Sequence, residues 1–255
     1  MKIGIKLGNR FDKDKGILEY FENKVDFFEI SAIQEKNYYS LLENSSLPII
    51  IHAEHHDFGI NYADNSIYNK NLRSLNFARG IADTLKSDRI IVHPGGIEQG
   101  NPNCSKENLI NFFKNIEDNR ILLENLPGKE KDQNLFTLCV TPDEIKYVME
   151  STKKGFCFDV NHAIFVLTQN NNLNYDIIKD YISLNPRHYH IGGQKIQEPF
   201  THQSLEDSEL DLSKILINYP IDAEISLETR HGDFETKDKD IQIIKKVIKI
   251  LEERI

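Results

Sequence analysis

Six short, mostly apolar runs along this chain of 255 residues each end at a histidine or a carboxylate. They are Ile49-Ile50-Ile51-His52, Ile90-Ile91-Val92-His93, Ile121-Leu122-Leu123-Glu124, Phe156-Cys157-Phe158-Asp159, His188-Tyr189-His190 and Ile225-Ser226-Leu227-Glu228. A seventh run, 25–31, ends without an obvious ligand. One such residue at the end of a buried strand is ordinary. Six would converge only if the strands were parallel and the sheet closed, which predicts a barrel with a metal site at its mouth.

The rest of the chain alternates between short β-branched or aromatic runs and longer amphipathic stretches. Strands are expected at 2–7, 25–31, 48–52, 89–93, 120–124, 155–159, 187–191 and 223–228. Helices are expected at 14–23, 34–43, 64–86, 105–118, 141–151, 175–184, 210–217 and 237–253. This alternation implies parallel pairing through crossover helices. We predict a single (β/α)8 TIM-barrel domain over residues 1–255, because an open doubly wound sheet would need a glycine-rich turn that Gly8-Asn9-Arg10 does not supply.

Composition restricts the partners of the protein. Lysine and arginine number 31 against 40 aspartates and glutamates, a formal charge of -9, which argues against nonspecific nucleic-acid or membrane adhesion over the whole surface. Bound divalent ions would reverse that charge locally, so a phosphate-bearing substrate stays open. The start Met1-Lys2-Ile3-Gly4-Ile5 has no signal-peptide pattern, and no apolar run approaches a membrane span, so a cytoplasmic protein is expected.

The strand-end carboxylates Glu124, Asp159 and Glu228 start near the barrel interior, where an unpaired charge is very costly. A salt bridge is the usual explanation for one of them alone, but Lys195 and Arg230 are the main basic candidates nearby. Imidazole and carboxylate without thiolate suit Zn, Mn or Fe. Eight candidate ligands are too many for one ion and predict two or three: His52, His93, Glu124, Asp159, His162, His190, His202 and Glu228.

These fragments resemble the xylose isomerase-like TIM barrels and, within them, endonuclease IV (AP endonuclease family 2), a zinc-dependent DNA repair nuclease. The resemblance spans about 48–229. It is carried by Val92-His93-Pro94-Gly95, Leu123-Glu124-Asn125, Gly155-Phe156-Cys157-Phe158-Asp159-Val160-Asn161-His162-Ala163, Tyr189-His190-Ile191, His202-Gln203-Ser204-Leu205 and Leu227-Glu228-Thr229. Each fragment is short, and the match lies in their order and spacing.

The resemblance implies three ion positions, with Glu124 bridging the first two. The first would use His52, His93 and Glu124, the second Glu124, Asp159, His190 and Glu228, and the third His162 and His202 with an aspartate two residues before His202. Phe200 occupies that aspartate position, so the third site is expected to lack its carboxylate. The implied reaction is attack of a metal-bound hydroxide on a phosphoester, with abasic-site DNA as one substrate.

An alternative is a sugar or hydroxy-keto-acid isomerase or epimerase. It would use one metal at Glu124, Asp159, His190 and Glu228, with Glu124 and Glu228 as proton shuttles. His52 and His93 favour the hydrolase, since the isomerase has little need of them as ligands. His55, Lys195 and Arg230 are candidates for substrate contact, and His188 faces the same way as His190 and could be a ligand or fill the barrel.

Overall fold

A computed structural model describes residues 1–8, 16–36, 39–43, 45–128, 134–169, 174–196, 202–229 and 234–253. Eight parallel strands form a closed barrel, with the first strand paired to the last. They are β1 (Lys2–Gly8), β2 (Phe27–Ala32), β3 (Ile49–Ala53), β4 (Ile90–Val92), β6 (Ile121–Glu124), β8 (Gly155–Asp159), β9 (His188–Ile191) and β10 (Glu224–Leu227). The predicted (β/α)8 architecture is confirmed.

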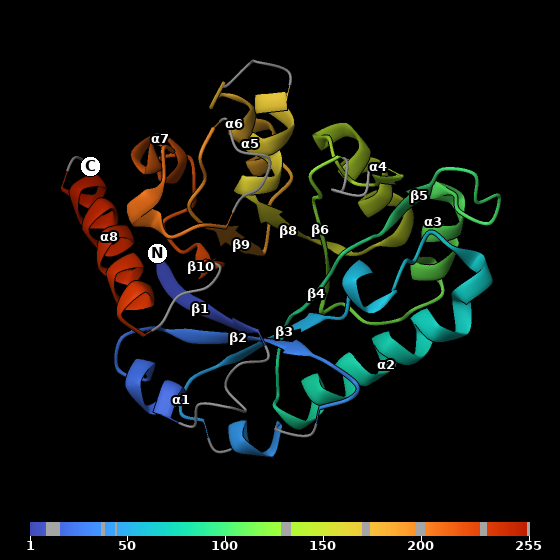
Figure 1. The fold of residues 1–255 in the computed structure, drawn as a ribbon, viewed down its shortest axis with the longest axis horizontal. Helices are drawn as coiled ribbons and strands as arrows, with labels where there is room; N and C mark the ends of the chain where they lie inside the picture. Colours follow the sequence, from blue (N-terminus) through green and yellow to red (C-terminus); the bar gives the residue numbers. More distant parts are fainter. Residues whose placement is uncertain are drawn as a thin grey trace.

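Helices surround the strands, and blue β1 lies next to red-orange β10 (Figure 1). The α-helices are α1 (Gly16–Phe21), α2 (Tyr68–Thr84), α3 (Lys106–Lys114), α4 (Pro142–Thr152), α5 (Val160–Gln169), α6 (Ile177–Ile182), α7 (Leu212–Leu216) and α8 (Phe234–Glu252). Short 3-10 turns are η2 (Tyr39–Leu42), η3 (His56–Phe58), η4 (Asn65–Ile67) and η5 (Leu205–Asp207). None of the helices in the described ranges is both long and apolar enough to cross a bilayer.

Three local predictions were wrong or incomplete. The helix expected at 34–43 is only the turn η2 within the described residues, where the Tyr39 hydroxyl accepts from the Ile33 amide at 2.6 Å and so ties the turn to the end of β2. Helix α5 was not predicted; it begins directly after β8, and Oδ1 of Asp159 accepts from the His162 amide at 2.8 Å, as an N-cap does. An antiparallel pair, β5 (Gly96–Glu98) with β7 (Leu135–Thr137), was also missed.

The barrel interior contains its own small hydrophobic layer, separate from the larger core between strands and helices. It consists of Phe27, Ile50, Ile91, Leu122 and Cys157, one residue from each of five strands. Gly4 on β1 belongs to the same level, because a Cβ there would lie 2.3 Å from the Phe27 ring. Phe27 therefore fills the space that a side chain at position 4 would need.

The next inward position on every strand is polar. Side chains alternate between the two faces of a strand, so the residue two positions further along points inward again. Those residues are Lys6, Glu29, His52, His93, Glu124, Asp159, His190 and Glu228. The apolar layer therefore forms the floor of a polar site toward the carboxyl ends of the strands, the end at which TIM barrels place their active sites.

Candidate metal centre

Glu124 lies at the centre of the polar layer and is 1% exposed. Its Oε2 is 3.3 Å from His52 Nε2 and 3.2 Å from His93 Nε2, and its Oε1 is 3.3 Å from His190 Nδ1. One carboxylate thus faces two groups of imidazoles, one with each oxygen. His52, His93 and Glu124 form the first group that could hold an ion.

The second group consists of Glu124, Asp159, His190 and Glu228. Nδ1 of His190 is 3.0 Å from Glu228 Oε2 and 3.9 Å from Asp159 Oδ2. Strands β6, β8, β9 and the end of β10 supply these residues, so segments more than 100 residues apart converge because the sheet is closed.

The third group is Asp159, His162 and His202, all buried. Oδ2 of Asp159 is 3.7 Å from His162 Nδ1 and 3.8 Å from His202 Nε2, and no donor within the described ranges hydrogen-bonds to it. Phe200, where the resemblance places an aspartate, lies outside the described residues. Asp159 brings a carboxylate to this position, which was expected to lack one.

The proton positions at two histidines bear on whether a cation fits. Nδ1 of His52 is 2.9 Å from the Ala53 carbonyl and must donate to it, and burial lowers the pKa of the ring, so the neutral form turns the Nε2 lone pair toward Glu124 Oε2. A lone pair facing a carboxylate is repulsive unless a proton or a metal lies between them. Two ligands about 2.05 Å from a tetrahedral zinc are themselves about 3.3 Å apart, and His52 Nε2 and Glu124 Oε2 are separated by 3.3 Å.

His162 is held in the same manner. Its Nδ1 is 2.8 Å from the Asn125 carbonyl and donates to it, and this same nitrogen lies 3.4 Å from Glu124 Oε1 and 3.7 Å from Asp159 Oδ2, while Nε2 keeps a lone pair in the neutral ring. Backbone carbonyls that fix the tautomer of a ligating histidine are a regular feature of metal sites.

Lys6 and Glu29 are members of the polar layer that the sequence reasoning missed. Nζ of Lys6 is 2.8 Å from Glu228 Oε1 and 3.6 Å from Glu29 Oε1. The second strand was expected to carry no ligand because its end is bare; its carboxylate instead lies inside the strand, two residues after Phe27. The signal was available, since a glutamate within Phe27-Phe28-Glu29-Ile30 breaks an otherwise apolar run.

The site holds four carboxylates, Glu29, Glu124, Asp159 and Glu228, and one ammonium, Lys6. Without a metal ion, the remaining positive charge must come from protonated histidines: burial opposes protonation of His190, but neighbouring carboxylates raise its pKa well above the usual value. Burial opposes the ionisation of Glu124, but His190 and His93 hold its pKa well below the usual range. Burial likewise opposes that of Glu228, and Lys6 lowers its pKa well below the usual range. Ionised carboxylates without enough partners are strongly disfavoured, so this donor set fits divalent ions.

The remaining predicted site residues lie in different places. His55 is beside the first group, with its ring stacked on His93 at 4.9 Å between centroids, and burial lowers its pKa well below the usual value. Lys195 is half-buried in the segment after β9. Arg230 lies outside the described residues.

Burial raises the pKa of Cys157, in the apolar floor of the barrel, to about 12, which keeps this thiol protonated.

No family model and no curated protein matches the chain. Solved structures do match it. A D-tagatose 3-epimerase-like protein is 19% identical over 100% of this chain and 99% of its own, with a TM-score of 0.72. Endonuclease IV from Thermus thermophilus is 17% identical over 100% of both chains, with a TM-score of 0.69. D-allulose 3-epimerase from Methylomonas sp., in complex with D-allulose, is 13% identical over 100% and 97%, with a TM-score of 0.68. The chain shares its TIM-barrel fold with these proteins, and the likeness at these identities concerns the fold alone.

Proposed function

We propose that this protein is a divalent-metal-dependent hydrolase of phosphoesters that holds two or three ions, most simply zinc, at the mouth of the barrel. The observation that carries the proposal is the position of Glu124, whose two oxygens face two separate sets of histidines. A single ion at the second group would leave the His52 and His93 rings facing Glu124 Oε2 with no ion to bind. A carboxylate shared by two ions uses both sets.

The ligand assignment follows the three groups. His52, His93 and Glu124 would hold the first ion; Glu124, Asp159, His190 and Glu228 the second; and Asp159, His162 and His202 the third. Ions bound there would supply Lewis acidity and water activation at neutral pH. Asp159 would belong to two ion positions, since its Oδ2 lies between His190 and the His162–His202 pair.

The protein's own residues have further roles in this proposal. Glu124 and Glu228 border the place where the reacting group would sit, and the buried walls exclude bulk water from it. His55, stacked on His93, is placed to contact the substrate at the rim. Lys195 and Arg230 follow β9 and β10 and would offer cationic groups to a phosphate. An abasic site in duplex DNA is the substrate that the likeness to endonuclease IV makes worth testing first.

The second candidate is a sugar epimerase, which the epimerase structures among the matches favour. It would use the second group alone, with Glu124 and Glu228 moving protons. The Lys6 ammonium, 2.8 Å from Glu228 Oε1, works against this role, because an ion-paired carboxylate is a weak base.

The test is a direct comparison of the two chemistries. Zinc-loaded and manganese-loaded protein would be assayed on a duplex carrying a tetrahydrofuran abasic-site analogue, on a simple phosphodiester, and on D-allulose. Glu124→Gln is the inactive control, and Glu54→Gln, another buried carboxylate that bonds to Ser74 and Gln34, is the matched control that should stay active. Phosphoester cleavage lost only in Glu124→Gln supports the hydrolase. Epimerisation without cleavage would replace it by the second candidate.

A further inference from the structure

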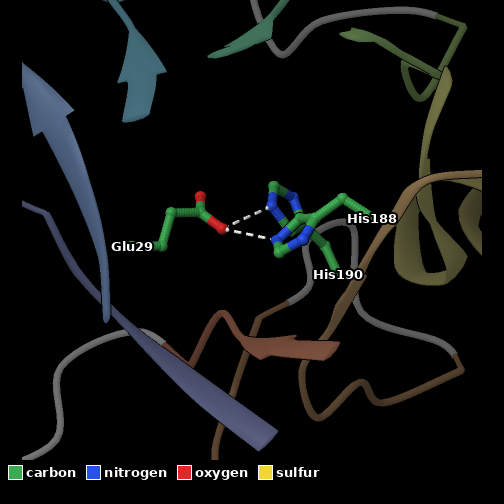
Figure 2. Close-up of side chains that lie close together, drawn as sticks. All are labelled: Glu29, His188 and His190. Atoms are coloured by element: carbon green, nitrogen blue, oxygen red, sulfur yellow. Dashed lines mark hydrogen bonds and ion pairs between the residues drawn. The ribbon is translucent and has the colours of Figure 1, made fainter. Parts of the chain in front are cut away.

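Glu29 lies at the centre of a buried hydrogen-bond network on the inner side of the second group. The side chain is 0% exposed, and its Oε2 is 2.9 Å from His190 Nε2 and 3.0 Å from His188 Nε2. Figure 2 shows the carboxylate directed at both rings, with one oxygen meeting the two nitrogens. The Ser226 hydroxyl donates to the same oxygen at 2.5 Å. Three groups from β9 and β10 therefore converge on one residue of β2.

The protons in this network can be assigned from its partners. Nη1 of Arg89 is 3.4 Å from His188 Nδ1, and a guanidinium only donates, so Nδ1 of His188 is the acceptor. His188 then carries its proton on Nε2, which lies 3.0 Å from Glu29 Oε2 and 2.9 Å from the Ser226 oxygen, and donates it between these two acceptors. Burial lowers the pKa of His188 to about 4, in agreement with a neutral ring.

The position of the proton on His190 also follows from its partners. A carboxylate oxygen that already receives a hydroxyl and an N–H is an acceptor, so Nε2 of His190 must donate its proton to Glu29. The opposite ring atom, Nδ1, is then the one that faces Glu228 Oε2 at 3.0 Å and Glu124 Oε1 at 3.3 Å.

We propose that Glu29 is a positioning residue that holds the Nε2–H of His190, so that His190 binds metal through Nδ1, with His188 and Arg89 as the outer links that orient the carboxylate. The proposal rests on the proposed function only in taking the second group as a metal site. Arg89 is fixed in turn by ion pairs to Asp88, at 3.0 Å, and to Glu224, so the network is anchored at the amino-terminal end of the barrel.

A purely structural role for Glu29 and a positioning role predict different results when Glu29 is replaced. If the carboxylate only satisfied buried donors, its loss would lower the free energy of unfolding but leave the ring atom used by His190 unchanged. If it sets the tautomer, its loss must weaken metal binding at the second group, and partners of ligating histidines contribute about 10–100-fold to metal affinity.

The experiment compares Glu29→Gln with the matched control Glu54→Gln, which changes a carboxylate buried to a similar degree, 5% exposed, outside the three groups. Zinc affinity is measured by competition with a chromophoric chelator. Glu29→Gln is expected to weaken one ion about 10–100-fold, while Glu54→Gln keeps the wild-type affinity. In the zinc-loaded wild type, ring 15N spectra of labelled histidine are expected to show His190 ligated at Nδ1 and protonated at Nε2.

Three results would overturn the proposal. One is wild-type zinc affinity in a folded Glu29→Gln protein. A second is ligation of His190 through Nε2 in the wild type, a measurement that needs no variant and so tests the proposal even if Glu29→Gln fails to fold. An anomalous zinc peak between Glu29, His188 and His190 would also contradict it, because those atoms would then be ligands. Absence of phosphoester cleavage in the wild type would remove the proposed function without touching these readouts.

Discussion

Replacing Lys6 with methionine should destabilise the metal-free protein and strengthen its binding of metal ions. The Lys6 ammonium is 2.8 Å from Glu228 Oε1 and 3.6 Å from Glu29 Oε1, and its side chain is 12% exposed. Methionine keeps most of the volume and removes the charge. Without metal, the two carboxylates then lose their nearest ammonium inside the barrel.

The size of the effect follows from the burial of the pair. Removing one partner of a buried ion pair costs about 3–5 kcal/mol, and the 22% exposure of the Glu228 side chain places this pair at the lower end. With metal bound, the ion supplies the missing positive charge, so the expected loss falls to about 1 kcal/mol, as for a well-screened pair. The difference of about 2 kcal/mol corresponds to roughly 30-fold tighter metal binding in Lys6→Met.

The assay is urea unfolding with chelator and with zinc, together with a chelator-competition titration. Lys2→Met is the matched control, because Lys2 lies on the same strand and pairs with Glu224 at 2.8 Å but is 62% exposed, so its loss should cost much less than that of Lys6 in either condition. Equal losses for Lys6→Met with and without zinc, or unchanged zinc affinity, would refute the idea that the ammonium and the ions compete for the same carboxylates.

Three further changes probe other parts of the structure. His202→Ala should lower bound zinc by one ion per chain; an unchanged metal content would remove the third position. Hydrogen bonds from Arg120 hold the pKa of Asp118 well below its usual range against the opposing effect of burial, so its stabilising contribution is present above about pH 4 and lost as the pH falls through the lowered pKa. Asp118→Asn should therefore cost about 1–3 kcal/mol at pH 7 and progressively less below about pH 4 in urea unfolding; a cost independent of pH would contradict this. Phe27→Ala should cost about 3–5 kcal/mol, and a loss under about 1 kcal/mol would show that the floor of the barrel is not packed as described.

The eight barrel strands could be predicted because each is a short apolar run, and their closure followed from the ligands at six strand ends. Helix α5 was missed because it begins at Val160, directly after β8 ends at Asp159, with no loop between strand and helix. Its start depends on Oδ1 of Asp159 capping the His162 amide, a contact that only the folded chain defines.

The sequence named the candidate ligands at strand ends that the structure brings together, but it did not name Lys6 and Glu29, which lie within strands. Glu29 and Lys6 sit where period-two alternation points them inward, but the phase of that alternation depends on which face of each strand lines the barrel. Phe27 against Gly4 sets this phase, and the contact joins two strands that are separated in sequence by helix α1. The pairing of Glu29 with His188 and His190 joins β2 to β9, which are not neighbours in the barrel order and have no local signal in sequence.

The most direct test of the multinuclear centre is a crystal structure of protein purified without added metal, with anomalous data at the zinc, iron and manganese edges and elemental analysis of the same sample. We predict two or three ions per chain, with one between His52, His93 and Glu124, a second sharing Glu124 with His190, and any third beside His162 and His202. A single ion at Glu124, Asp159, His190 and Glu228, with none at His52 and His93, would contradict it.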